Sequence, residues 1–439
     1  MGGDAASRSG SVDVRRDRGT RRRTVTVFDV DLPPGIAFVR SLGRAGVPVV
    51  ACSSRRFPAG GLSRHVSGRR SSPSVHHSDQ FISWLVDEVA SGGIDLIAPT
   101  SDFVSFCVAE ALEQLGPNPP DVGHPSPDAL RTCLFKARFF EALDAIGFPS
   151  PPTAVPSSVG EALADAERIG YPVVLKPRSH VGIGTHRGLV VRTAGELEVA
   201  FEPFELGDAH DSALRHVPDL AVPLLQRYCE RGTVECISVS GFLGRDGQLV
   251  ALNHSRKVSQ WPRRFGVGTV FEPVPSQPFT TAAVDAVRSI LGSGLFELEV
   301  LVDRRTGEYG AIDLNPRAFG QVALDIALGN DLPCIWYEAV TGSELGARPP
   351  SGRPPEFWQD ALSVHVETTL NLIRGPHRRA VARDAIRRVR APKVDAAMDR
   401  WDPLPGVIFG MARLRHPRAF VRQFLVDTEV ASSSSGQPS

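Results

Sequence analysis

The sequence of 439 residues is poor in cysteine: it has six, scattered along the chain, and none of them forms a CxxC pair. Several lie within apolar runs, a position typical of reduced thiols in a protein core. This pattern indicates neither a disulfide framework nor a zinc site built from closely spaced thiolates. We therefore expect a protein of the reducing cytoplasm.

Long apolar runs are also missing. No run reaches the roughly 18 residues that a membrane-spanning helix needs, and the N-terminal segment lacks the apolar stretch of a secretory signal. Residues 1–23 instead contain seven arginines and three aspartates, with no aromatic side chain among the arginines. We interpret this segment as a solvated tail and expect no membrane and no nucleic acid partner. A basic tail that contacts nucleic acid is the alternative.

Several motifs of other nucleotide-binding and hydrolytic enzymes are absent. The chain has no GxxxxGK(S/T) loop, which excludes a Walker A phosphate site. Only one glycine, Gly35, lies between the first predicted strand and the first predicted helix, where a dinucleotide-binding fingerprint needs several. No Ser-His-Asp, Cys-His or HExxH arrangement indicates hydrolysis. A dehydrogenase built on the first domain is therefore the weakest alternative.

The chain does contain an alternation of predicted strands and helices. Residues 24–30 form a β-branched run, a helical stretch follows, and residues 47–52 form a second strand. A buried strand at 94–98 and a helix from Asp102 come next. We predict an α/β domain with a small parallel sheet over residues 24–125.

The pattern changes at Ser126, where a second domain is predicted to begin. A helix that carries Lys136 is followed by a Gly- and Pro-rich break and by a helix that opens with Ser158 and Glu161, the spacing of a capping box. Residues 344–360, rich in proline and glycine, predict a linker or loop. The predicted division is a basic disordered tail at 1–23, a first domain at 24–125, a second domain at 126–343 with a lid at about 150–228 and a core at about 229–343, an extension at 344–430 and a disordered end at 431–439.

A lysine lies at the end of an apolar strand in the second domain. The run Tyr171-Pro-Val-Val-Leu-Lys176 leads through Arg178 into a loop that contains Gly182 and Gly184. A lysine within an apolar strand needs an anion. A phosphate group is such an anion, and the glycines of the loop would let backbone N–H groups approach its oxygens. A lysine that reaches the surface is the alternative.

Two predicted strands joined by a turn near Thr306 carry polar residues two positions apart. Glu297 and Glu299 lie on one face of the first strand, and Asp313 and Asn315 on one face of the second. If the hairpin is centred on Thr306, residue 299 lies opposite 313 and 297 opposite 315, with Cβ atoms about 5 Å apart. Hard oxygen ligands in this arrangement suit Mg²⁺ bound jointly to nucleotide phosphates. Solvated acids on an exposed hairpin are the alternative.

Three further segments carry candidate residues. Arg317 follows the second of these strands directly, in place to stabilise a transferring phosphoryl group or to bind a carboxylate. Residues 224–235 predict a strand, a turn and a second strand, with backbone groups as candidates for adenine recognition and Glu235 for the ribose hydroxyls. The arginines between 374 and 390 are interpreted as the solvated face of a helix, with an anionic site as the alternative.

Taken together, the order of these features resembles the ATP-grasp superfamily. That order is Lys136, Lys176 with its glycine loop, the connector 226–235, the acid pair, and the motif Asp313-Leu-Asn-Pro-Arg317. A narrower resemblance, to the carboxylate–amine ligase branch that includes D-aspartate ligases, is carried by residues 40–49, 63–65, 255–257, 266–272 and 313–317. The resemblance covers about residues 24–345. It implies an α/β, ATP-grasp fold in which a Rossmann-like domain precedes two α+β subdomains that enclose the nucleotide.

The resemblance also implies roles for individual residues. The expected ATP ligands are Lys136, Lys176, Arg178, Gly182, Gly184, Gln226, Arg227, Tyr228, Cys229 and Glu235; the expected Mg²⁺ or Mn²⁺ ligands are Glu299, Asp313 and Asn315; the expected catalytic residues are Arg317 and Lys257. Gln226 and Asp313 stand where family members more often have an acid and a glutamate. His180 and His186 replace small residues of the loop.

The implied reaction joins a small-molecule carboxylate to an amine, with amino acids as the expected substrates. The carboxylate attacks the γ-phosphate, and an amine displaces phosphate from the acyl phosphate to give an amide. A small-molecule kinase of the same superfamily and a nucleotide-binding module without turnover are the alternatives. We expect substrate contacts from Arg256, Trp261, Arg263, Arg264 and residues 265–269, and a homodimer as the default oligomer.

Overall fold

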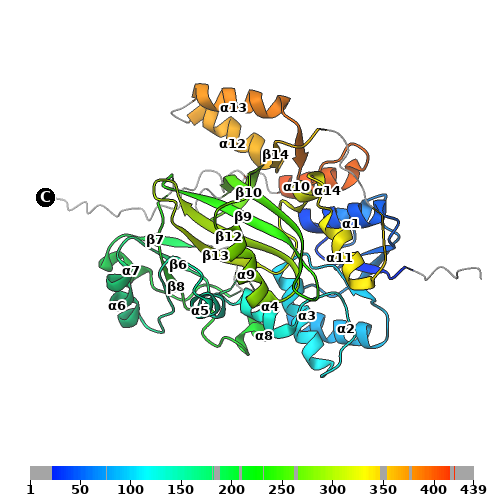
Figure 1. Ribbon diagram of the computed structural model, residues 1–439, viewed down its shortest axis with the longest axis horizontal. Coiled ribbons are helices and arrows are strands. Elements are labelled where there is room, and N and C mark those ends of the chain that lie inside the picture. Colours follow the sequence, from blue (N-terminus) through cyan, green and yellow to red (C-terminus); the bar gives the residue numbers. More distant parts are fainter. Residues whose placement is uncertain are drawn as a thin grey trace, which may run out of the picture.

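The computed structural model describes residues 22–75, 77–179, 181, 188–206, 210–230, 232–261, 265–346, 353–374, 378–415 and 420. These parts of the chain form three β-sheets with helices packed around them (Figure 1). None of the helices described there is long and apolar enough to cross a membrane. Most of both predicted tails lies outside these ranges. Arg22 and Arg23, which the sequence assigned to the first tail, donate to the carbonyl oxygens of Ala45 and Asp95.

The first sheet is parallel, as predicted, with the strand order β3-β2-β1-β4. β1 (Val25–Val27) lies between β2 and β4, so its carboxyl end adjoins that of β4 (Leu96–Ile97). In a parallel sheet, the crevice between strands whose connections run in opposite directions is a usual place for a ligand. The other elements are α1 (Pro33–Arg44), β2 (Val49–Ser53), a 3-10 turn at Gly60–Leu62, β3 (Gly68–Ser71), α2 (Ser78–Ala90) and α3 (Asp102–Gln114).

The helix α3 begins at this edge of the sheet. Its N-cap is Ser101, whose side chain accepts a hydrogen bond from the backbone N–H of Val104 at 3.2 Å. Such a cap satisfies one of the free N–H groups at the start of a helix. Asp102 is therefore the first helical residue, and its carboxylate lies at the carboxyl edge of the first sheet.

The second sheet is antiparallel, with the order β5-β8-β6-β7. The predicted strands at 173–176 and 189–191 are confirmed as β6 and β7. Ser158 accepts from the N–H of Glu161 as predicted, but the Glu161 carboxylate accepts from Ser157, so the capping box is only half formed. The elements from the end of the first domain onward are α4 (Pro127–Leu134), α5 (Lys136–Ile146), β5 (Thr153–Ala154), α6 (Val159–Ile169), β6 (Val173–Lys176), β7 (Leu189–Val191), α7 (Ala194–Ala200), α8 (His210–Leu214) and β8 (Leu224–Arg227).

The third sheet is the largest, with the order β13-β12-β9-β10-β11-β14-β15. Its core contains apolar side chains from the strands together with those of α5 and α9, including Phe139, Val287, Phe296 and Leu298. The burial of these side chains fixes which face of each strand is apolar. The elements are β9 (Val234–Leu243), β10 (Leu249–Trp261), β11 (Val267–Pro273), α9 (Thr280–Leu291), β12 (Gly294–Asp303), β13 (Tyr309–Asn315), α10 (Val322–Ala327) and α11 (Leu332–Thr341).

The C-terminal extension is part of this sheet, which corrects one prediction. Residues 344–360 were interpreted as a linker or loop, yet Phe357–Gln359 form β14, which pairs with β11, and Lys393–Asp395 form β15, which pairs with β14. The rings of Phe357 and Trp358 are buried. Burial of these rings on the sheet outweighs the local preference of proline and glycine for loops. The other elements are α12 (Ala361–Arg374), α13 (Arg378–Arg390) and α14 (Pro403–Leu414).

Candidate active site

The acidic hairpin is formed by β12 and β13, and its register is the predicted one. Glu297 lies opposite Asn315, and Glu299 lies opposite Asp313. On the other side of β12, Ser238 of β9 lies beside Glu299. Because side chains alternate along a strand, these polar groups share one face of the sheet, and the apolar residues between them pack into the core on the other face.

Two lysines from other elements reach the acids of this hairpin. The ammonium of Lys257, in β10, donates to Glu299 at 2.5 Å, and that of Lys136, at the start of α5, donates to Asp313 at 2.9 Å. Only 5% of Lys136 is exposed. Each pairing places a partly buried cation against a carboxylate, where the attraction is stronger than in bulk water. The hairpin therefore lies at a cluster of charges drawn from separate parts of the chain.

Glu297 was not among the predicted metal ligands, but it is part of this cluster. Only 4% of it is exposed. Its carboxylate accepts from Ser238 at 2.7 Å, from Asn315 at 3.0 Å and from Gln321 at 2.5 Å. Burial, and after it repulsion from Glu299, raises the pKa of Glu297 to about 7. Burial raises a carboxyl pKa because it withdraws the charged form from water, and the negative charge of a neighbouring carboxylate raises it further.

Arg317 joins the hairpin to the first sheet. Its Nε and Nη2 donate to the two carboxylate oxygens of Asp102 at 2.7 and 2.9 Å, and Nη2 also donates to Asn315 at 2.9 Å. Burial by itself lowers the pKa of Arg317, but Asp102 raises it above the ordinary arginine value. Asp102 was not among the predicted site residues. The signal that could have found it was its place at the start of the helix that follows a strand of the parallel sheet.

Lys176 ends β6, and its ammonium donates to the side-chain oxygen of Gln226 at 2.7 Å. The amide nitrogen of Gln226 donates to Thr153 at 2.8 Å, which orients the amide. Burial, and after it repulsion from Lys136, lowers the pKa of Lys176 to about 8. Because the amide is uncharged, Gln226 leaves the positive charge of Lys176 for an anion.

Arg178 and Arg227, both predicted to contact ATP, bond to the protein itself. Arg178 donates to the carbonyl oxygens of Val222 at 2.9 Å and Pro156 at 2.7 Å, and it pairs with Asp219. Arg227 donates to the carbonyl oxygen of Ile169 at 2.9 Å. Arg178 is thus tied to the segments just before α6 and β8, and Arg227 to the end of α6, so both arginines have a structural role.

Glu235, predicted for the ribose, lies between two arginines. It pairs with Arg256 at 3.1 Å and with Arg304 at 3.2 Å. Arg256, predicted for the substrate, also pairs with Glu272 at 2.7 Å. Glu235, predicted to bind the nucleotide, and Arg256, predicted to bind the substrate, are therefore part of one network of ion pairs.

The remaining predicted residues fall into two groups. The rings of Tyr228 and Phe265 are 6.2 Å apart, Cys229 is partly buried with its thiol pKa raised by burial, and Trp261 is buried at the end of β10. The residues that lie outside the described ranges are His180, Gly182, Gly184, His186, Arg263 and Arg264.

Comparison with known proteins adds distant relatives. No family model matches the chain. The chain is 25% identical over 242 residues to the C-terminal section of the carbamoyl phosphate synthase large chain of Methanopyrus kandleri, a match that covers 52% of this chain and 42% of that protein. The chain spans less than half of the length of the curated relatives it matches.

Solved structures resemble the chain more fully. The biotin carboxylase domain of Hydrogenobacter thermophilus 2-oxoglutarate carboxylase, in complex with magnesium ADP and bicarbonate, superposes with a TM-score of 0.60 at 20% identity, over 77% of this chain and 74% of that one. The L-amino acid ligase of Bacillus licheniformis superposes with a TM-score of 0.54 at 17% identity, over 75% of this chain and 78% of that one. These likenesses show that the chain has the ATP-grasp fold, and the fold prediction is confirmed.

Proposed function

We propose that the chain is an ATP-dependent ligase that joins a carboxylate to an amine through an acyl phosphate and releases ADP and phosphate. One observation carries the proposal: Glu299 and Asp313 face each other on one hairpin, and each accepts a hydrogen bond from a lysine of another element. Charged groups are expensive to withdraw from water. A fold that gathers several of them at one place therefore favours a function that uses their charge.

The donor set of the hairpin fits Mg²⁺ or Mn²⁺. Glu299, Asp313 and Asn315 offer hard oxygen ligands on one face of the sheet, and the Glu297 carboxylate lies on the same face. We assign Glu299, Asp313 and Asn315 to the metal, with Lys136 and Lys257 as the groups that balance the acids in its absence. A bound divalent ion would neutralise charge on the phosphates of the nucleotide.

Lys136 and Lys176 are the residues that we assign to the ATP phosphates. Lys136 begins α5 and Lys176 ends β6; burial lowers the pKa of Lys176, and repulsion from Lys136 lowers it further. A polyanion offsets such repulsion, so a triphosphate between the two lysines would stabilise the charged form of each. The complex of the Hydrogenobacter structural neighbour with magnesium ADP supports a nucleotide in this fold.

The proposed reaction has two displacements. An oxygen of the substrate carboxylate attacks the γ-phosphorus, the bond from phosphorus to the ADP oxygen breaks, and the acyl phosphate forms. The amine nitrogen then attacks the acyl carbon, phosphate leaves, and the amine loses a proton to give the amide. We propose that Lys257 and Arg317 stabilise the negative charge that develops on the transferring group, because carboxylates hold both cations near the hairpin.

An ADP-release screen with pairs of amino acids and other small acids tests this proposal. With hydroxylamine in place of the amine, a ligase should produce a hydroxamate from its acyl phosphate. A kinase would give a stable phosphorylated product and no hydroxamate. Binding of Mg-ATP without ADP release across the whole panel would contradict turnover and favour a binding module.

Affinity for Mg-ATP should depend on the protonation of Lys176. Because the pKa of Lys176 is about 8, its positive charge is lost as the pH rises through this value, and affinity should fall. The fall can reach about tenfold per pH unit if phosphate binding raises the lysine pKa. Lys176→Arg keeps its charge in this range and should flatten the profile. Calorimetric titration at several pH values measures both curves, and superimposable curves would contradict the role of Lys176.

A further inference from the structure

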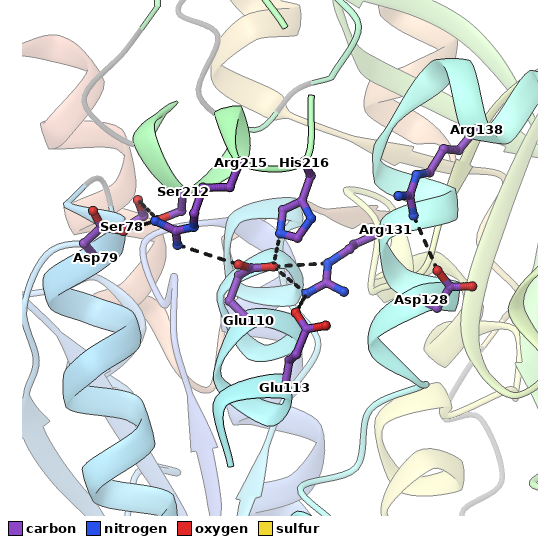
Figure 2. A network of polar contacts seen from close by, with 10 residues as sticks. All are labelled: Ser78, Asp79, Glu110, Glu113, Asp128, Arg131, Arg138, Ser212, Arg215 and His216. Atoms are coloured by element: carbon purple, nitrogen blue, oxygen red, sulfur yellow. Dashed lines mark hydrogen bonds and ion pairs between the residues drawn. The ribbon is translucent and has the colours of Figure 1, made fainter. Parts of the chain in front are cut away.

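A buried polar network lies apart from the hairpin and joins three elements (Figure 2). At its centre is Glu110 of α3, which is 5% exposed. The guanidinium of Arg131, in α4, donates to one Glu110 oxygen through Nη2 at 2.7 Å and Nε at 3.1 Å, and Nε2 of His216 donates to the same oxygen at 2.8 Å. Arg131 also pairs with Glu113, one turn further along α3. The network therefore links α3 and α4 to the segment that follows α8.

The segment that carries His216 belongs by sequence to the second sheet, because it lies between α7 and β8. It nevertheless packs on the first domain. Ser212 contacts Ser78 at 2.9 Å at the start of α2, and Ala213 and Leu220 are buried in the same apolar cluster as residues of α2 and α3. Figure 2 shows Ser212, Arg215 and His216 of this segment pointing toward Asp79 of α2 and Glu110 of α3. The two domains are thereby connected at a point away from the hairpin.

An aromatic contact extends the network toward the phosphate-binding lysines. The His216 ring lies 6.2 Å from the ring of Phe135 and 6.3 Å from that of Phe106, and the two phenylalanine rings are 6.2 Å apart. Phe135 is 1% exposed. His216 is therefore packed against the residue that immediately precedes Lys136.

The backbone around Lys136 is held on both sides. The N–H of Phe135 donates to the carbonyl oxygen of Arg131 at 3.0 Å, and the N–H of Lys136 donates to that of Arg178 at 2.8 Å. Phe135 also forms a β-bridge with Ser179, just beyond β6. The same residues that contact Glu110 and His216 thus fix the start of α5, where Lys136 lies.

We propose that His216, held by Glu110, is a positioning residue for Lys136. The inference rests on the proposed binding of ATP phosphates by Lys136. A lysine side chain is long and flexible, so the place of its ammonium depends on how firmly its backbone is held. His216 packs against the ring of Phe135, and it does so from the segment between α8 and β8, which lies on the helices of the first domain. The tightness of this contact therefore sets how well Lys136 meets a phosphate.

The cluster does not suit a metal ion instead. Glu110, Glu113 and His216 lie close enough together to share a cation. Arg131, however, already places its guanidinium against both carboxylates. A second cation would be repelled by this charge, so the polar groups are better used as a bridge between helices.

The expected result is a loss of Mg-ATP affinity without loss of any group that touches the nucleotide. His216→Ala should raise the Kd of Mg-ATP by about 3- to 30-fold, the range for changes along a packed network. Arg138→Ala is the matched control. Arg138 lies on α5, the helix that begins with Lys136, and forms an exposed ion pair with Asp128 of α4. Removal of this pair should leave the Kd unchanged. Calorimetry well below the unfolding temperature measures each Kd.

A double-substitution cycle separates positioning from a general effect on folding. If His216 acts through Lys136, then His216→Ala should change the Kd by less than about twofold once Lys136→Ala is already present. An equal rise in both backgrounds, or wild-type affinity in His216→Ala, would overturn the inference. If His216→Ala does not fold, His216→Phe, which keeps a ring against Phe135 but loses the bond to Glu110, takes its place in the same cycle. Failure of the unaltered protein to bind Mg-ATP would instead count against the proposed function.

Discussion

Glu299→Gln and Asp313→Asn should each reduce ADP release by at least about 100-fold, the scale on which removal of one charged group from a catalytic site acts. Each substitution keeps the size of the side chain but removes a negative charge from the hairpin. The proposed metal would lose a ligand, and Lys257 or Lys136 would lose the carboxylate that it contacts. ADP release with the best substrate pair from the screen measures the effect.

Glu308→Gln is the control for this prediction. Glu308 lies in the same hairpin, next to the turn, but is exposed and outside the polar face. The same type of substitution there should leave ADP release within about twofold of the unaltered protein, as is usual at exposed sites. Normal turnover in Glu299→Gln and Asp313→Asn would refute our assignment of the metal and of the reaction site.

Arg40→Ala should lower the free energy of unfolding by about 3–5 kcal/mol, because it leaves a buried carboxylate without its partner. Arg40, in α1, donates to Asp402 at 2.9 Å and to the carbonyl oxygen of Ala397 at 2.8 Å. Asp402 is 3% exposed and also accepts from Ser63 at 2.7 Å. This cluster attaches the C-terminal extension to the first domain. Urea unfolding, followed by the fluorescence of tryptophan, measures the loss.

Arg44→Ala provides the comparison, because Arg44 lies one turn further along α1 and pairs with Asp399 of the same extension. The side chain of Arg44 is 42% exposed, so its loss should cost about 0–1 kcal/mol. Equal effects of the two substitutions would contradict the importance of burial. The outcome would also show how firmly the extension is attached.

The effect of Arg40→Ala should depend on pH in a defined direction. Burial by itself raises the pKa of Asp402, but hydrogen bonds from Ser63 and Arg40 lower it below its usual range. A lowered carboxyl pKa contributes stability above the pKa of the unfolded state, about 3.9, and this contribution is lost as the pH falls. The difference in stability between the unaltered protein and Arg40→Ala should therefore shrink below about pH 4. A difference that grows on acidification would contradict this account.

Local patterns predicted a large part of the fold. The parallel first sheet, the strand that carries Lys176, and the register of the acidic hairpin all follow from periodicity within short segments. A two-residue period leaves few registers for a hairpin with a short turn, because a shift by one residue would exchange the apolar and polar faces. Glu299 could thus be placed opposite Asp313 before any tertiary contact was known.

Contacts between distant segments were not predictable in this way. Arg317 is 215 residues from Asp102, and His216 is 106 residues from Glu110. The residues around Asp102 and Glu110 form no local pattern that predicts which cation each acid contacts. β14 was missed for a related reason: its place in the third sheet depends on pairing with β11, while the residues before it favour a loop.

The sequence by itself determined which motifs are absent, the order along the chain of the lysines and acids that we assign to phosphates and metal, and the face of the hairpin on which the acids lie. These properties depend on residue type and on spacing within one strand or helix. Only the tertiary structure decided which cation meets which carboxylate: Lys136 with Asp313, Lys257 with Glu299, and Arg317 with Asp102. The physical reason is that a charge acts through space, and its partner is chosen by how three sheets pack rather than by distance along the chain.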